Sequence, residues 1–210
     1  MRVIAEGAEA RVFAADILGI HAVAKRRERK SYRINQIDTG LRSQRTRVEA
    51  RILGIAAAVG VDSPRPLLVH DCEIVMSDVG GTTLRHALAD NGLGEHAAAR
   101  MMRAAGSNLG RLHRANIAHG DYTPANIVVA PRARLAVIDF GLSEVTQSIE
   151  AKAIDLLLMK RSVDSRLFSD FLYGYRSSFR GADKVIRRLL AIERRGRYKT
   201  RTLLVTDDAP

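Results

Sequence analysis

Short runs of alternating apolar and polar residues, separated by glycines, occupy the first 26 positions of the chain. The segments RVIAEG, RVFAADILG and IHAVAKR all have this pattern. A period of two residues is typical of strands with one buried face, and glycine permits tight turns between them. The N-terminal region is therefore predicted to form three short antiparallel strands.

A helical period replaces this alternation between residues 31 and about 59. Apolar residues recur there at three- and four-residue spacings, with an interruption around Gly40, which predicts one or two helices. They are Ile34, Ile37, Leu41, Val48, Ile52, Leu53 and Ile55. Strand character returns in PRPLLVHDCEIVMSDVGG and ends at Gly80 and Gly81.

Most of the chain after this glycine pair is predicted to be helical. Thr82 or Thr83 is a candidate N-cap for a short helix that extends to Asp90. An alanine-rich helix is expected from Glu95 to about Asn116. Its buried face is predicted to contain Met101, Ala105, Leu109 and Leu112.

Two brief strands, NIVVA and RLAVIDFG, follow, and the region from about 148 to 195 is again predicted to be helical. The expected fold class is α+β with two lobes. A small, mainly β N-terminal lobe covers residues 1–79, a reduced, mainly α C-terminal lobe covers residues 80–201, and a tail covers residues 202–210.

Composition narrows the class of protein. With 210 residues and 46% hydrophobic content, the chain can fill a core. The single cysteine excludes an intramolecular disulfide framework and a multi-cysteine zinc site. No apolar run approaches the roughly 20 residues that span a bilayer, and the N-terminus lacks a signal-peptide core. We expect a soluble, cytoplasmic protein.

The net charge of +11 is concentrated in two segments. Residues 25–51 contain ten lysines and arginines against three acidic residues, and residues 184–201 contain eight against one. Such clustering favours a positive surface for a polyanion such as RNA. A solvated helix face with no partner is an equally good interpretation of the charge alone.

The segment HGDYTPANIVV, residues 119–129, has the composition of a phosphoryl-transfer loop. That reaction needs a carboxylate to orient the attacking oxygen and accept its proton, and oxygen ligands for Mg²⁺. Asp121 and Asn126 have the required spacing. Asp139 in IDFG is a second candidate metal ligand, and Gly141 frees the turn after it.

Lys25, at the end of the strand HAVAK, is a candidate for neutralising nucleotide phosphates. Such a lysine must be held by a carboxylate, and Glu49 is the candidate because apolar Ile52 and Leu53 follow it on the same helix. The alternative is that Lys25 belongs to the basic cluster and that Glu49 pairs with a neighbouring arginine.

The segment EGAEARVF lies where kinases have a glycine-rich phosphate loop, but it contains one glycine. Its backbone amides around Gly7, Ala8, Glu9 and Ala10 are candidates for contact with the nucleotide because the side chains are small.

Together these motifs resemble a protein-kinase-like fold, and more narrowly the small atypical kinases of the KEOPS complex, the PRPK-type family. The resemblance rests on EGAEARVF, RKSYRINQIDTGLRSQRTRVEARIL, HGDYTPANIVV and VIDFGLSEVTQSIEAKAIDLLLMKR, and extends from about residue 4 to 201. It implies ATP and Mg²⁺ as cofactors, weak protein kinase activity, and ATP hydrolysis that supports a partner subunit. That partner, accompanied by small accessory subunits, makes N6-threonylcarbamoyladenosine on tRNA.

The resemblance also implies a role for individual residues. Lys25 would bind phosphates, Glu49 would orient Lys25, Asp121 would be the base, Asn126 and Asp139 would hold Mg²⁺, and Met76 and Asp78 would lie near the adenine. The basic segments 25–51 and 184–201 would face tRNA, with part of the first in contact with the partner subunit. Neither a membrane nor DNA is expected as a partner.

Several features of ordinary protein kinases are missing. Gly120 and Thr123 stand where those kinases have arginine and lysine, there is no Ala-Pro-Glu sequence, and only ten residues separate Gly141 from Ala151. A conventional activation segment and peptide platform are therefore not expected.

Two other functions remain open. The first is a RIO-like or small-molecule phosphotransferase, against which the segment 29–53 argues. The second is a kinase-shaped, tRNA-binding scaffold without catalysis. The presence of Lys25, Asp121, Asn126 and Asp139 argues against that scaffold.

Overall fold

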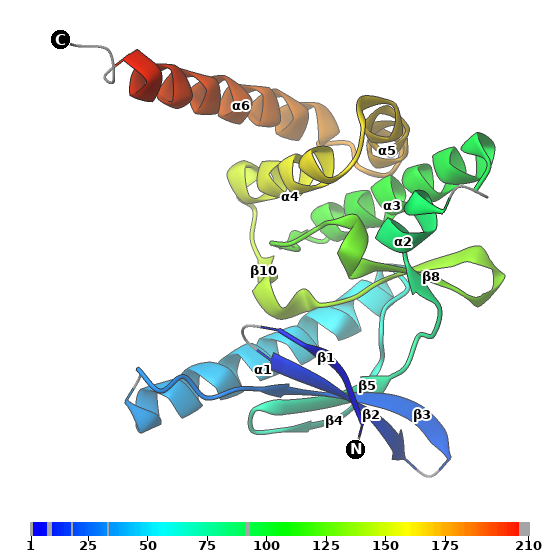
Figure 1. Ribbon diagram of the computed structural model, residues 1–210, viewed down its shortest axis with the longest axis vertical. Coiled ribbons are helices and arrows are strands. Elements are labelled where there is room, and N and C mark those ends of the chain that lie inside the picture. The colour runs from blue at the N-terminus through cyan, green and yellow to red at the C-terminus, as the bar shows by residue number, and fades with distance from the viewer. Residues whose placement is uncertain (1, 8–9, 18, 33, 91–92, 206–210) are drawn as a thin grey trace.

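The computed structural model describes residues 2–7, 10–17, 19–32, 34–90 and 93–205, with side chains described up to residue 195 (Figure 1). An antiparallel sheet in the order β1-β2-β3-β5-β4 forms the N-terminal lobe. Its strands are β1 Val3–Glu6, β2 Ala10–Ile17, β3 Ile20–Arg27, β4 Pro66–His70 and β5 Glu73–Ser77. The three predicted N-terminal strands are confirmed.

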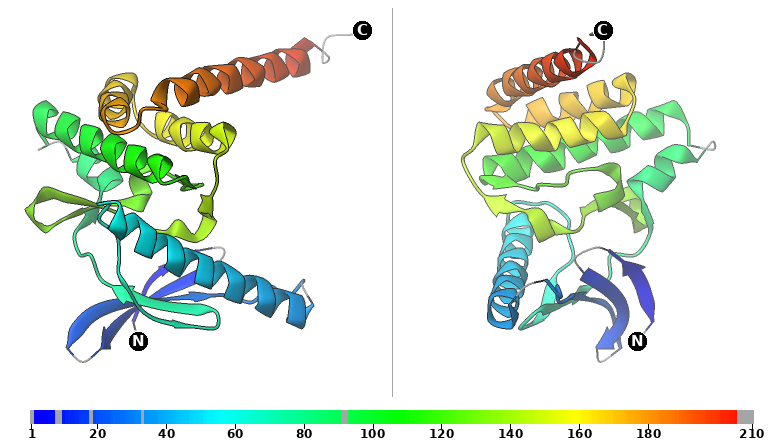
Figure 2. Two further views of the ribbon diagram at one scale, coloured as in Figure 1. Left: turned by 180° about the vertical axis from the view of Figure 1, so that it is seen from behind. Right: turned by 60° about the vertical axis from the view of Figure 1, so that its left-hand side comes forward.

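One helix, α1 (Asn35–Ala58), fills the segment in which one or two were predicted, and it continues through Gly40. It packs beside the sheet and reaches toward the C-terminal lobe (Figure 2). Ile52 and Leu53 are buried as expected, whereas Ile34 and Ile37 are 70% and 57% exposed.

Polar contacts explain why the N-terminal half of α1 does not bury its apolar residues. Asp38 is completely buried and its Oδ2 accepts a hydrogen bond from Arg42 Nε at 2.7 Å. Arg42 Nη1 in turn donates to the carbonyl of Arg27, at the end of β3, at 3.2 Å. The face of α1 that meets the sheet is therefore partly ionic, and apolar residues on the other face are exposed to solvent.

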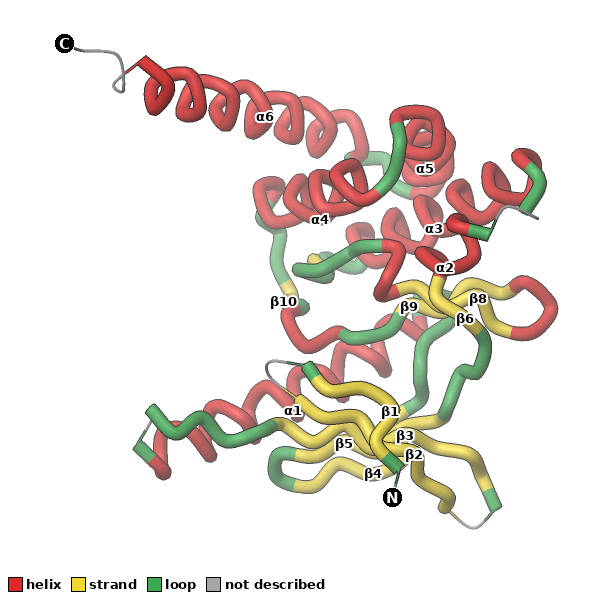
Figure 3. Tube along the Cα trace, in the orientation of Figure 1, coloured by secondary structure: helices red, strands yellow, loops and turns green. Residues whose placement is uncertain are grey.

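The C-terminal lobe is built mainly from helices, which occupy the upper part of Figure 3. They are α2 Leu84–Ala89, α3 Glu95–Arg114, α4 Ile149–Ser162, α5 Ser165–Ser178 and α6 Ala182–Val205. Thr83 caps α2 by accepting a hydrogen bond from His86 N. Helix α6 continues past residue 201 to Val205 and extends beyond the other helices (Figure 2).

Helices α3 and α5 form the core of this lobe at a glycine-mediated crossing. A Cβ atom on Gly174 would lie 1.9 Å from the carbonyl oxygen of Arg103, and one on Gly106 would lie 1.9 Å from that of Phe171. Ala105, Leu109 and Leu112 of α3 are fully buried as predicted, but Met102 takes the buried place expected for Met101. The two backbones pack too closely for any side chain at these glycines.

Replacing Gly174 with alanine is accordingly expected to lower the free energy of unfolding by about 1–3 kcal/mol, because the helices must separate to admit the methyl group. Gly54 in α1 is the matched control, since a Cβ there meets no atom within 4 Å. Gly54→Ala should raise stability by about 0.5–1 kcal/mol. Urea unfolding of both variants tests this, and equal effects would contradict the close crossing.

Short strands between the long helices carry the loops of interest. Strands β8 (Ile127–Ala130) and β9 (Arg134–Val137) pair as the predicted hairpin. Strand β6 (Thr82–Thr83) extends this pair, and β7 (Ile117–Ala118) pairs with β10 (Glu144–Val145). Short 3₁₀ turns lie at Pro124–Asn126, Pro131–Ala133 and Phe140–Leu142. Only one short turn and β10 separate Asp139 from the start of α4 at Ile149, so the expected lack of an activation segment agrees with the structure.

Within the described ranges, none of the helices is long and apolar enough to cross a membrane.

Candidate active site

Strand β3 and helix α1 bring Lys25 and Glu49 into contact. Lys25 Nζ lies 2.7 Å from Glu49 Oε1, and both residues are almost fully buried, at 7% and 2% exposure. The buried face of α1 that carries Ile52 directs Glu49 toward the sheet. Of the two pairings considered from the sequence, the structure has the one with Lys25, although an arginine shares the carboxylate: Arg27 Nη2 lies 2.6 Å from Glu49 Oε2.

Lys25 also reaches Asp139 from the other lobe, with 2.6 Å between Nζ and Oδ1. Asp139 has a left-handed backbone (φ 59°), and its side chain accepts a hydrogen bond from Gly141 N at 3.2 Å. Burial by itself would raise the pKa of this carboxyl, but the charge and hydrogen bond of Lys25 outweigh burial and hold the pKa below its usual range. Asp139 is therefore ionised at neutral pH.

Asp121 and Asn126 are joined directly within the loop. Asn126 Nδ2 donates to Asp121 Oδ2 at 2.8 Å and to the Asp121 carbonyl at 2.9 Å. The amide nitrogen is thereby turned toward Asp121, and Oδ1 is the atom of this side chain that can ligate a cation. Ile138 N donates to the Asn126 carbonyl at 2.9 Å, which ties the loop to the residue before Asp139.

A carboxylate that the sequence analysis did not single out, Asp155 of α4, anchors this loop. It is completely buried. Its Oδ2 accepts from His119 N at 2.7 Å, and its Oδ1 accepts from Gly120 N at 2.8 Å. The available signal was an acidic residue within the apolar run AIDLLLM, because a buried charge requires partners.

Two histidines pack around this carboxylate. His113 Nε2 lies 3.1 Å from Asp155 Oδ2, and its Nδ1 lies 2.7 Å from the hydroxyl of Tyr175. His119 Nε2 lies 3.2 Å from the carbonyl of Ile138. Burial lowers the pKa of both histidines, and the nearby Asp155 only partly offsets it. Both imidazoles are therefore neutral in the folded protein at pH 7.

These lowered pKa values predict a loss of stability in mild acid. The unfolded chain takes up protons near pH 6.5 and the folded protein does so only at lower pH, so the free energy of unfolding falls as pH drops below about 6.5. Each histidine lowers the free energy of unfolding by at most about 1.4 kcal/mol for each pH unit below this value. Urea unfolding at pH 7.5 and 5.5 should show a smaller loss in His113→Gln than in the wild type. An equal loss would contradict the assignment of His113.

The structure supplies a reason for the glycine at position 120. Gly120 has a φ of +80°, and a Cβ there would lie 2.5 Å from the carbonyl oxygen of Leu142. Arginine, which ordinary kinases have at this place, fits neither the backbone conformation nor the space. Thr123 contributes backbone contacts to the loop, since its N–H donates to the Asp121 carbonyl at 3.0 Å.

Of the remaining predicted nucleotide contacts, Ala10 and Met76 lie on strands of the sheet. Gly7 N donates to the carbonyl of Ala10 at 2.9 Å, and Ala8 and Glu9 lie outside the described residues. Met76 is buried on β5, and Asp78 Oδ1 accepts from Gly80 N at 2.9 Å beyond the end of that strand.

A hollow of about 430 Å³ lies elsewhere, at α2. It is lined by Thr82, His86, Ala87, Ala89 and Asp90. None of these is a predicted site residue, so the convergence of charged groups at Lys25 locates the candidate site better than the hollow does.

The ligand chemistry fits Mg²⁺ bound together with a nucleotide. In the described part of the chain, no three His, Cys, Asp or Glu side chains form a group that could hold a metal. One carboxylate (Asp139) and one amide oxygen (Asn126) are a typical protein share for Mg²⁺, which takes its other ligands from substrate phosphates and water.

Comparison with known proteins identifies the family. Residues 35–185 match the model of the lipopolysaccharide kinase (Kdo/WaaP) family. The KEOPS complex subunit Bud32 of Pyrococcus abyssi is 36% identical over 96% of this chain and 98% of its own length. The chain belongs to the Bud32 family and to the wider Kdo/WaaP-type kinase family.

Members of the Bud32 family also occur as parts of longer proteins. A probable bifunctional tRNA threonylcarbamoyladenosine biosynthesis protein of Methanocorpusculum labreanum is 38% identical over 91% of this chain, which spans only 35% of that protein. The protein-kinase-like fold is shown by the Rio2 kinase of Chaetomium thermophilum, solved as an ADP/Mg²⁺-phosphoaspartate complex. It has a TM-score of 0.63 at 17% identity, covering 94% of this chain and 70% of Rio2.

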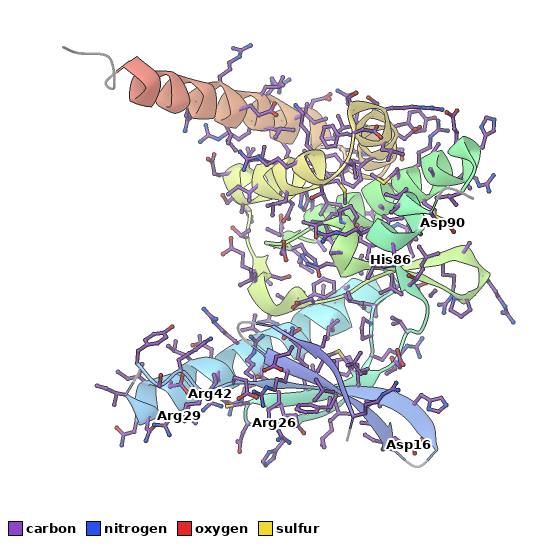
Figure 4. The ribbon with its side chains drawn as sticks, viewed as in Figure 1. Asp16, Arg26, Arg29, Arg42, His86 and Asp90 are labelled. Carbon is purple, nitrogen blue, oxygen red and sulfur yellow. The ribbon has the colours of Figure 1, made fainter. Side chains whose placement is uncertain are left out.

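The two basic segments differ in how much of their charge is accessible. Lys25 and Arg27 are buried in the candidate site, so they are not part of a surface for nucleic acid. Arg26 and Arg29 are exposed near the sheet and the start of α1 (Figure 4). In the second segment the exposed cations are Lys184, Arg187, Arg194 and Arg195, and the side chains beyond residue 195 lie outside the described part.

Proposed function

We propose that this chain is a Mg²⁺-dependent ATPase and atypical serine/threonine kinase that acts as a KEOPS subunit and supports N6-threonylcarbamoyladenosine formation on tRNA. The observation that carries the proposal is the meeting of Lys25 with Glu49 and Asp139 in a chain 36% identical to a KEOPS subunit along nearly its whole length. A structure freed from phosphoryl transfer has no need to bury this lysine against two carboxylates.

Each residue has a separate task in this proposal. Lys25 moves from Asp139 to the nucleotide phosphates while Glu49 holds it, and Asp121 orients the attacking oxygen and accepts its proton. Asn126 and Asp139 hold Mg²⁺, which when bound neutralises charge on the phosphates.

The nucleotide itself would be contacted by residues of the N-terminal lobe. The proposed phosphate contacts are Gly7, Ala8, Glu9 and Ala10, and the proposed adenine contacts are Met76 and Asp78. ATP is accordingly the nucleotide expected in this site.

The proposed partners are the threonylcarbamoyl-transferase subunit, its small accessory subunits, and tRNA. The exposed arginines of segments 25–51 and 184–201 would contact tRNA phosphates, so binding should weaken steeply with salt. The lack of an activation segment fits control by a partner protein.

Reconstitution with a transferase subunit and tRNA at constant salt tests the proposal. The wild type should support formation of the modified adenosine, whereas Asp121→Asn should lower it by about 10²-fold or more while tRNA binding is retained. If Asp121→Asn supports modification as well as the wild type does, the chain acts as a scaffold and the catalytic proposal fails.

A further inference from the structure

Glu49 binds two cations, one on each carboxylate oxygen. Oε1 lies 2.7 Å from Lys25 Nζ, and Oε2 lies 2.6 Å from Arg27 Nη2. Arg27 is 4% exposed, so its guanidinium is as buried as the other two groups. Successive side chains of a strand point to opposite faces, which puts Lys25 and Arg27 on one face of β3 and Arg26 on the other. Arg26 accordingly pairs with Glu73, away from the site.

The charged groups of Arg27, Lys25 and Asp139 converge on one backbone position of the loop after Asp139. A Cβ on Gly141 would lie 3.3 Å from both Arg27 Nη2 and Lys25 Nζ, and 3.0 Å from Asp139 Oδ1. Arg27 therefore belongs to the same buried layer as the candidate catalytic groups. The sequence does not reveal this place in the site, because Arg27 is one of many cations in the basic segment 25–51.

Arg27 fixes Glu49 whatever the position of Lys25. A buried carboxylate is costly unless its oxygens are paired. Lys25 has two acceptors in this structure, Glu49 and Asp139, and it must exchange Asp139 for phosphates during the proposed reaction. Throughout that exchange, Arg27 keeps the second oxygen of Glu49 occupied and the carboxylate in one orientation.

The end of β3 also attaches the helix that carries Glu49. Arg42 of α1 donates to the Arg27 carbonyl and pairs with buried Asp38, whose Oδ1 accepts from Lys30 N at 3.3 Å. Protein kinases use a phosphorylated activation segment to bring the equivalent helix and its glutamate into place. Residues 141–151 are too few for such a segment, so α1 needs another attachment.

We propose that Arg27 is a positioning residue that locks Glu49, and through it α1, in the arrangement in which Lys25 can serve the phosphates. This inference rests on the proposed function. It assigns to a buried ion pair within the N-terminal lobe the task that an activation segment has in other kinases.

The first test compares Mg²⁺-dependent ATP turnover, per folded molecule, in four proteins. Arg27→Gln should lower kcat by about 10- to 100-fold, the usual effect of losing a group that orients a direct ligand, with a smaller change in KM for ATP. Arg27→Lys keeps a cation beside Glu49 and should recover most of the loss. Arg134→Gln, which breaks an exposed ion pair with Asp62, should match the wild type.

A double-mutant comparison separates positioning from direct contact with the nucleotide. If Arg27 acts through Glu49, the double variant Arg27→Gln, Glu49→Gln should turn over within about threefold of Glu49→Gln alone. This comparison holds even when Arg27→Gln alone fails to fold, because the double variant removes both charges together.

Two results would overturn the inference: a double variant at least 10-fold slower than Glu49→Gln, or wild-type kcat in Arg27→Gln. Absence of Mg²⁺-dependent turnover in the wild type, measured with the transferase subunit present, would instead defeat the proposed function.

Discussion

ATP turnover in Asp139→Asn is expected to fall by about 10²-fold or more, which corresponds to about 3 kcal/mol of transition-state stabilisation. The substitution removes the proposed charged metal ligand and one of the two acceptors of Lys25. Asparagine tolerates the left-handed backbone at this position, so the loop should keep its shape.

The same variant should retain its stability. The side chain of Asp139 is 52% exposed, and Lys25 remains paired with Glu49. We expect the free energy of unfolding to change by less than about 1 kcal/mol. Asp62→Asn, which breaks an exposed ion pair with Arg134, is the control for both measurements. Continued hydrolysis at the wild-type rate in Asp139→Asn would refute the metal assignment.

Asp155→Asn, unlike Asp139→Asn, should lower the free energy of unfolding as well as ATP turnover. The carboxylate of Asp155 accepts hydrogen bonds from the backbone of His119 and Gly120, one on each oxygen. An amide group has only one acceptor atom, its oxygen. One of the two buried backbone N–H groups therefore loses its acceptor and faces the NH₂ group of asparagine. The expected loss is about 3 kcal/mol in the free energy of unfolding.

Turnover should fall with it, because the loop that Asp155 anchors continues directly into Asp121. Urea unfolding and ATP turnover on the same preparation measure both effects. Asp170→Asn is the control, since Asp170 pairs with the half-exposed Arg103 and should cost less than about 1 kcal/mol. Wild-type stability in Asp155→Asn would show that the anchor is dispensable.

The local parts of the fold and site were predictable from the sequence. The hairpin of β8 and β9 follows from two apolar runs close together, and it brings the loops of Asn126 and Asp139 to one place. Lys25 and Glu49 were candidates because the spacing of apolar residues placed Lys25 at the end of a strand and Glu49 on the buried face of a helix. Their residue types also match what phosphoryl transfer requires.

What escaped prediction depends on contacts between distant segments. Asp155 is 35 residues from Gly120, and its place in an apolar run looks like a core position with an odd residue. Arg27 could not be told apart from its basic neighbours in the sequence. It differs from Arg26 only in the face of the strand on which its side chain lies. The exposure of Ile34 and Ile37 could not be foreseen, since the opposite face of α1 is held by ionic contacts that periodicity does not reveal.

Gly120 was partly predictable from the sequence. Its sequence position shows that the usual arginine is missing, but only the structure gives the reason, the close approach of the Leu142 carbonyl. The loop is therefore a complete structure adapted to glycine, and not a kinase loop that has lost a residue.

ADP formation in the presence of the transferase subunit, with and without Mg²⁺, tests the central claim most directly when the wild type is compared with Lys25→Met. We predict turnover that requires Mg²⁺ in the wild type and falls by at least about 10²-fold in Lys25→Met. Turnover that is independent of Mg²⁺, or equal in the two proteins, would contradict the account.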